Sequence, residues 1–143
     1  MKRDPQPKYF YYVGIDTGVN TGYAVWSKKD KMLLDIRTVK IHQAMQMLSA
    51  LYASEKRILV RIEDARIRKW VQGGREKLQG AGSIKRDAKI WEDFLRDSQI
   101  DFELVPPKQN RTKLDESLFK NLTNWIGRTS EHARDAAMLV YGY

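Results

Sequence analysis

The sequence contains no cysteine, which excludes a disulfide framework, a thiolate zinc site and a thiol nucleophile. It also lacks an apolar run long enough to span a bilayer and an apolar segment typical of a secretory signal. These absences favour a protein of a reducing compartment that does not enter a membrane. We therefore expect it in the cytoplasm, associated with the nucleoid.

Internal repeats and low-complexity tracts are also lacking, and 143 residues are most economically one domain. The first eight residues, MKRDPQPK, are polar and broken by proline. We expect residues 1–8 to form a flexible arm and residues 9–143 to form a single folding unit.

Positive charge is in excess, with 26 Lys and Arg against 18 Asp and Glu and a formal net charge of +8. Such a balance favours a polyanionic partner, nucleic acid first and an acidic membrane surface second. Residues 66–89 alone carry a net charge of +6. The excess is therefore concentrated in one stretch of the chain.

The apolar pattern predicts an α/β fold. Short segments rich in β-branched and aromatic residues predict five strands: 9–15, 21–27, 31–41, 57–63 and 101–105. Apolar residues at helical spacing predict helices elsewhere: 41–54, 84–95, 112–126 and from 130 towards the C-terminus. The first three strands should form an antiparallel meander, and two parallel strands should complete a five-stranded mixed sheet flanked by helices.

Two of the predicted helices carry more specific expectations. The helix after Pro106-Pro107 should begin with a capping signature of Thr112 and Asp115 and end at Gly127. Its predicted buried stripe consists of Leu114, Leu118, Leu122 and Trp125. The helix at 84–95 has more apolar surface, at Ile84, Trp91 and Phe94, than one core contact requires, which suggests a dimer interface.

Four ligand-type side chains are expected at one edge of the sheet. Asp16 ends the first strand and Glu63 ends the fourth. A right-handed crossover can set these strands parallel, so that their carboxyl ends lie about 4.8 Å apart, where open α/β sheets place their sites. His132 and Asp135 share one face of the last helix, and the alanines beside them allow close packing on the sheet.

Clustered carboxylates repel each other unless a cation lies between them. Hard divalent cations bind such oxygens, and two of them about 3.5 to 4 Å apart promote phosphodiester hydrolysis. Simpler interpretations stay open, because Asp16 could be a turn aspartate and His132 a histidine at a helix start. We also expect Gly18 and Gly22 to leave space for a phosphate backbone.

The motifs GIDTG, TGYAVW, IEDA and HARDAA occur in this order from residue 14 onwards. Together they resemble the RuvC-type Holliday junction resolvases of the RNase H-like superfamily. The resemblance implies an RNase H-like fold and a catalytic, metal-binding set of Asp16, Glu63, His132 and Asp135. It also implies two Mg²⁺ or Mn²⁺ ions per site, a homodimer acting on four-way DNA junctions, and roles in DNA recombination and repair. The compact length resembles phage-encoded members, which act in a phage-infected bacterial host.

Basic residues after Glu63 and after the double proline predict DNA contacts, because Lys and Arg neutralise phosphates. Trp70 could stack on an unpaired base or anchor the segment to the core. Gly73-Gly74 and Gly80-Ala81-Gly82 suggest a loop that DNA orders. The predicted DNA-binding residues are Arg66, Arg68, Lys69, Trp70, Arg75, Lys77, Lys85, Arg86, Lys108, Arg111 and Lys113.

Three other functions remain open. A ribonuclease of the same superfamily would act on hybrid or precursor RNA, and a non-catalytic protein would bind DNA without cutting it. The stretch GIDTGVNTG also resembles the phosphate-binding turn of actin-like ATPases. Those proteins need two such domains around a nucleotide, and this chain has room for one.

Overall fold

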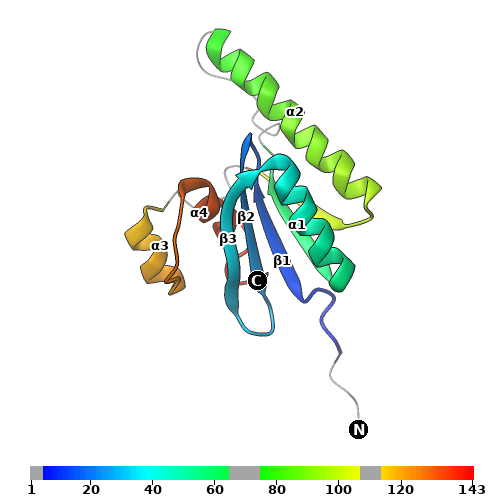
Figure 1. The fold of residues 1–143 in the computed structure, drawn as a ribbon, viewed down its shortest axis with the longest axis vertical. Helices are drawn as coiled ribbons and strands as arrows, with labels where there is room; N and C mark the ends of the chain where they lie inside the picture. The colour runs from blue at the N-terminus through cyan, green and yellow to red at the C-terminus, as the bar shows by residue number, and fades with distance from the viewer. Residues whose placement is uncertain (1–4, 65–74, 107–113) are drawn as a thin grey trace.

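The computed structural model describes residues 5–64, 75–106 and 114–143, without the side chains of 75–81, 83 and 84. Its centre is a five-stranded sheet in the order β3-β2-β1-β4-β5 (Figure 1). The strands are β1 (Tyr11–Asp16), β2 (Asn20–Ser27), β3 (Met32–Lys40), β4 (Ile58–Glu63) and β5 (Asp101–Val105). The helices are α1 (Ile41–Ser54), α2 (Arg75–Asp97), α3 (Glu116–Thr123) and α4 (Glu131–Met138).

The predicted sheet is confirmed. Strands β1, β2 and β3 pair antiparallel, and β4 pairs parallel with both β1 and β5. The crossover through α1 places β4 beside β1, in a register that pairs Ile15 with Ile62. Asp16 and Glu63 follow these two residues and end their strands.

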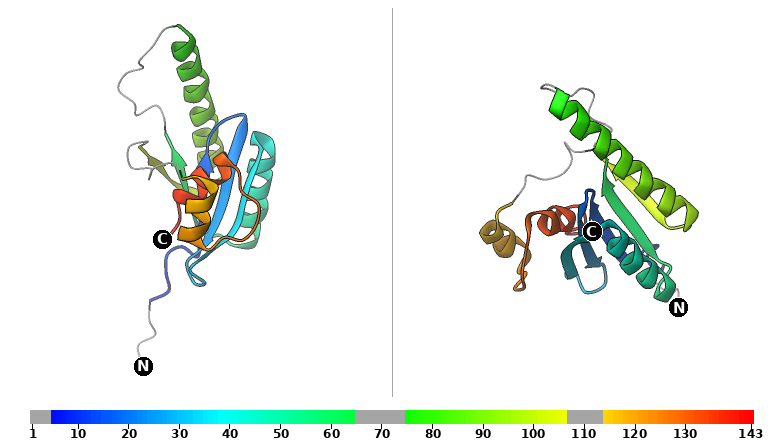
Figure 2. Two further views of the ribbon diagram at one scale, coloured as in Figure 1. Left: turned by 90° about the vertical axis from the view of Figure 1, so that its left-hand side faces the viewer. Right: turned by 45° about the horizontal axis from the view of Figure 1, so that its top comes forward.

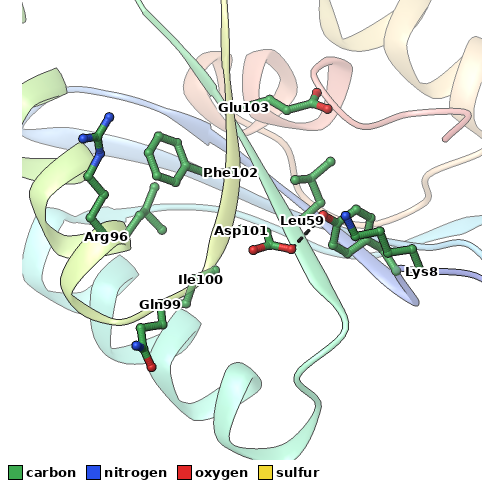
Figure 3. A pocket seen from close by; sticks show the side chains of 10 residues that line it. Lys8, Leu59, Arg96, Gln99, Ile100, Asp101, Phe102 and Glu103 are labelled. Atoms are coloured by element: carbon green, nitrogen blue, oxygen red, sulfur yellow. Dashed lines mark hydrogen bonds between the residues drawn. The ribbon is translucent and has the colours of Figure 1, made fainter.

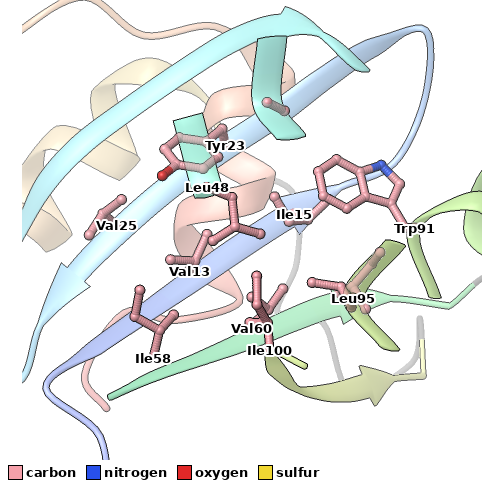
Figure 4. Close-up of a cluster of buried hydrophobic side chains, with 12 residues drawn as sticks. Val13, Ile15, Tyr23, Val25, Leu48, Ile58, Val60, Trp91, Leu95 and Ile100 are labelled. Carbon is pink, nitrogen blue, oxygen red and sulfur yellow. The ribbon is translucent and has the colours of Figure 1, made fainter. Parts of the chain in front are cut away.

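Each face of the sheet is covered by a different pair of helices (Figure 2). Val13 and Ile15 of β1 pack in one core with Leu48 of α1 and with Trp91 and Leu95 of α2 (Figure 4). The opposite face packs against α3 and α4 in a second core. Because successive side chains of a strand point to opposite faces, Gly14 and Asp16 belong to the α4 face.

The second helix begins earlier than its sequence predicts. Residues 75–83, expected as a loop, form the first turns of α2 despite Gly80 and Gly82. Figure 1 shows this end of α2 projecting beyond the edge of the sheet. Trp91 is completely buried and Phe94 packs against the same core, so neither supplies the free dimer surface that the sequence suggested.

The predictions for α3 are partly wrong. Asp115 caps the helix by accepting a hydrogen bond from the Leu118 amide at 2.8 Å, but Leu118 is 56% exposed. Leu122 is also exposed, and Phe119 is the buried residue instead. The helix ends at Asn124, whose φ of 59° gives a left-handed C-cap, and not at Gly127. Thr112 lies outside the described residues.

None of the helices in the described ranges is long and apolar enough to cross a membrane.

Candidate active site

The predicted site lies at the carboxyl ends of β1 and β4. Asp16 is the last residue of β1 and Glu63 is the last residue of β4. Asp16 points to the face covered by α4, as shown above. Arg61 lies two residues before Glu63 and donates a hydrogen bond to the Leu139 carbonyl on that face at 2.8 Å. By strand alternation, Glu63 points to the same face. The parallel register therefore brings the two carboxylates together at one edge.

Two glycines allow α4 to approach the sheet closely. A Cβ added to Gly22 would lie 2.0 Å from the carbonyl oxygen of His132, and one added to Gly14 would lie 2.0 Å from that of Ala136. No ordinary side chain fits at either distance. The space beside Gly22, expected from the sequence to admit a phosphate, is thus filled by the backbone of α4.

The close approach joins α4 to β1 through side chains as well. Nδ1 of His132 lies 2.9 Å from Oδ2 of Asp16, a hydrogen bond between residues 116 positions apart in the chain. Both groups are partly buried. His132 is therefore held at the end of β1 beside Asp16, a member of the same predicted set of ligands.

A second contact fixes the start of α4, and no local sequence pattern predicts it. Ser130, the N-cap residue, makes no capping hydrogen bond with its own helix. Its hydroxyl bonds that of Thr38 in β3 instead. A threonine 92 residues away cannot be recognised as a partner from its local pattern. This bond anchors the first turn, which carries His132, to the sheet.

The charge of Asp16 responds to burial, to His132 and to the other two carboxylates of the predicted set. The pKa of Asp16 is raised from 3.8 to about 6, mainly because burial penalises the charged form. The hydrogen bond and charge of His132 lower this pKa, while the negative charges of Asp135 and Glu63 raise it. Each of the other three predicted residues therefore influences the charge of Asp16.

No protein-family model and no curated protein sequence matches this chain. Its fold matches RuvC of T. thermophilus in complex with a Holliday junction substrate, with a TM-score of 0.59, 13% identity, and 90% and 89% of the two chains covered. The chain has a RuvC-like fold. A second Thermus thermophilus RuvC structure matches with a TM-score of 0.50, 14% identity and coverage of 90% and 92%. The large terminase nuclease of the thermophilic phage G20c matches with a TM-score of 0.52, 14% identity and coverage of 96% and 84%.

In the RuvC-like fold the predicted ligands lie at one end of the sheet, but their side chains do not form a complete metal-binding site. Among the described residues, no three His, Asp or Glu side chains are close enough to hold one ion. The donor set nevertheless fits a hard divalent cation, because it offers carboxylate oxygens and includes a buried carboxyl with a raised pKa. Binding of two Mg²⁺ or Mn²⁺ ions by these residues stays a prediction.

Most of the predicted DNA-binding residues cannot be placed. Lys85 and Arg86 are exposed on α2. Arg75 and Lys77 also lie on α2, but their side chains are not described. The others lie outside the described residues: Arg66, Arg68, Lys69, Trp70, Lys108, Arg111 and Lys113.

Stability should depend on pH through Asp16. A carboxyl group whose pKa is higher in the folded state destabilises the fold when it ionises. We therefore expect the free energy of unfolding of the metal-free protein to fall by about 2 kcal/mol as the pH rises from 4 through 6. Urea unfolding of the wild type and of Asp16→Asn across this range measures the effect. An equally steep fall in the variant would show that Asp16 is not its source.

Proposed function

We propose that this protein is a metal-dependent endodeoxyribonuclease that resolves four-way (Holliday) junctions and cuts other branched DNA. The observation that carries the proposal is the contact between Asp16 of β1 and His132 of α4, with Glu63 and Asp135 close enough to shift the pKa of Asp16. Three acids and a histidine at the carboxyl edge of a RuvC-like sheet form a set suited to phosphodiester hydrolysis.

Asp16, Glu63, Asp135 and His132 would hold two Mg²⁺ or Mn²⁺ ions. Bound there, the ions would activate a water molecule and stabilise the charge on the phosphate. Asp16 ends β1 beside β4 and contacts His132 of α4, so it would be the ligand at the centre of this set. Its buried carboxylate would gain most from a cation, because burial and its acidic neighbours penalise its charge.

As the alternative to binding an ion through Nε2, His132 would orient Asp16 and accept a proton. When Asp16 is ionised, Nδ1–H donates to Oδ2, which leaves Nε2 as the proton-accepting atom of the ring. An imidazole in this tautomer can take a proton from a water molecule that attacks a phosphodiester. The anchor between Thr38 and Ser130 would keep the ring in position.

The net charge of +8 and the exposed Lys85 and Arg86 support binding to a phosphate backbone. We further propose a homodimer, since paired nicking of a four-way junction needs two sites related by symmetry. The proposed setting is the cytoplasm of a bacterial cell or a phage-infected host.

Comparative cleavage tests the proposed function. We expect the wild type with Mg²⁺ or Mn²⁺ to cut a synthetic four-way junction in two symmetric positions, and to cut linear duplex of the same sequence on the order of 100-fold more slowly. Removing the metal with EDTA should abolish both reactions. A 3′ or 5′ flap and an RNA–DNA hybrid complete the set of substrates.

Other results would point to other functions. Preference for the hybrid would identify a ribonuclease, and binding without cleavage under any metal would identify a DNA-binding protein. Equal cutting of junction and linear duplex would favour a broad nuclease, in line with the structural similarity to a terminase nuclease. Light scattering that shows a monomer on the junction would contradict paired nicking.

A further inference from the structure

Basic side chains lie over aromatic rings at the end of the sheet opposite the candidate active site. The contacts join Lys8 to Tyr9, Lys28 to Tyr12, Lys56 to Tyr52 and Arg57 to Phe10, at 5.3, 5.7, 4.2 and 4.7 Å from the ring centroids. All four basic residues are exposed. We call these four cations and the rings beneath them the distal basic patch.

Backbone hydrogen bonds hold three separate segments of the patch together. The Phe10 amide donates to the Arg57 carbonyl at 2.8 Å, and the Lys28 amide donates to the Phe10 carbonyl at 3.0 Å. The patch therefore combines the approaches to β1 and β4 with the turn after β2. Figure 1 shows these segments at the end of the sheet that is nearer the N-terminus.

Two rings of the patch, those of Tyr9 and Tyr12, are held in place by further contacts. The Tyr9 hydroxyl donates to Asp101 at 2.8 Å beside a pocket of about 620 Å³ (Figure 3). Burial and this hydrogen bond raise the pKa of Tyr9 to about 12, which keeps the phenol neutral. The Tyr12 ring packs at 5.5 Å from that of Tyr143, which is 46% exposed.

The four cations lie over rings without a partner among the described carboxylates, whereas Arg61 and Arg96 lie over rings and also pair with carboxylates. Within residues 5–64, 75–106 and 114–143, several basic side chains pair with carboxylates: Arg37, Arg61, Lys89, Arg96 and Lys120. None of the described carboxylates forms such a pair with Lys8, Lys28, Lys56 or Arg57. A ring attracts a cation without neutralising it, so each of these side chains keeps its charge. The carboxylates within the patch bond other groups: Glu55 accepts from the Arg57 backbone amide and Asp101 accepts from the Tyr9 hydroxyl.

A cation resting on a ring also loses part of its rotational freedom before any ligand arrives. Less side-chain entropy is then lost when it meets an anion. Phosphates spaced along a chain suit several separate cations, and partly exposed rings beside them can contact sugars and bases. Tyr52 packs with the core on the α1 face and Tyr12 with the core on the α4 face, so the patch wraps around the end of the sheet and presents its cations to both sides. An isolated phosphate would use one cation, whereas a nucleic-acid backbone that crosses this end can meet several.

We propose that the distal basic patch binds the phosphodiester backbone of a nucleic acid, at a segment separate from the one at the carboxyl ends of β1 and β4. Strand β1 separates the two regions by about 17 Å, at roughly 3.3 Å per residue. One phosphate cannot therefore serve both. The identity of the segment, a second arm of the same branched DNA, rests on the proposed function.

The test replaces three cations of the patch and compares the result with a matched control. The patch variant is Lys28→Gln, Lys56→Gln and Arg57→Gln together. The control, Arg37→Gln, Lys120→Gln and Arg128→Gln, removes the same charge from residues that form no cation–π contact among those described. Fluorescence anisotropy without metal measures binding to a labelled junction from 50 to 300 mM salt.

We expect the patch variant to bind the junction about tenfold or more weakly at 100 mM salt, with a salt slope lower by about 2 to 3. The control should change affinity less than threefold. Equal losses in the two variants, or no loss in the patch variant, would overturn the proposal. Thermal unfolding checks that both variants fold, and Lys28→Gln alone gives a milder second test.

Failure of the patch and failure of the nuclease function give different results. If the wild type cuts the junction and the patch variant binds it normally, the patch proposal is wrong and the nuclease function stands. If the wild type cuts nothing and the patch variant still loses affinity, the patch stands without the nuclease. Binding to phosphatidylserine vesicles that the patch variant alone loses, with DNA binding unchanged, would show a membrane surface and overturn the proposal.

Discussion

Asp16→Asn is expected to lower the rate of junction cleavage by on the order of 10³-fold or more while the affinity for the junction stays within about threefold. Asparagine keeps the shape of the side chain and its hydrogen bond with His132, but it removes the charge that would hold a divalent ion. Single-turnover cleavage with Mg²⁺ and Mn²⁺ measures the rate, and anisotropy measures binding.

Asp35→Asn is the matched control for this experiment. Asp35 lies on β3 and pairs with Arg37 at 2.9 Å, so the same substitution removes a carboxylate away from the candidate site. Its cleavage rate should equal that of the wild type. If Asp16→Asn keeps more than a tenth of the wild-type rate, the assignment of Asp16 as the central catalytic carboxylate is wrong.

Gly22→Ala is expected to lower the free energy of unfolding by about 3 kcal/mol and the cleavage rate on the order of 100-fold. The new Cβ would meet the His132 carbonyl at 2.0 Å, so either β2 or α4 must move. Because α4 carries both His132 and Asp135, the shift disturbs the site as well as the packing. Urea unfolding and single-turnover cleavage measure the two effects.

Gly82→Ala provides the control, because a Cβ added at Gly82 meets nothing within 4 Å. In the helix α2 this change should raise the free energy of unfolding by up to about 1 kcal/mol. Cleavage should be unaffected. Equal stability of Gly22→Ala and the wild type would show that α4 does not pack as closely on β2 as the structure indicates.

Much of the sheet could be predicted because strands leave a strong local pattern. The β-branched and aromatic residues of β1 and β2 and the apolar run of β4 predict both the strands and where they end. Asp16 and Glu63 each end a strand, which the local sequence predicts. The general rule that crossover connections are right-handed then places the two strands in parallel. Together, the strand ends and the crossover rule predict that Asp16 and Glu63 lie at the same end of the sheet.

Helix α3 shows where local pattern was insufficient. Leu118, Leu122 and Phe119 give this short helix two apolar sides, and periodicity cannot decide which one is buried. The second core accepts Phe119 and leaves the two leucines exposed. The end of the helix depended on Asn124 adopting a left-handed conformation, which glycine adopts more readily.

The sequence by itself determined which residue types are available and at which strand or helix ends they occur, because those properties depend on neighbours a few positions away. Only the tertiary structure decided that Asp16 contacts His132, that Thr38 holds Ser130, and that α4 fills the space beside Gly22. Each of these contacts joins residues about 90 or more positions apart. They depend on how closely α4 packs on the sheet, a distance set by the shapes of both surfaces together.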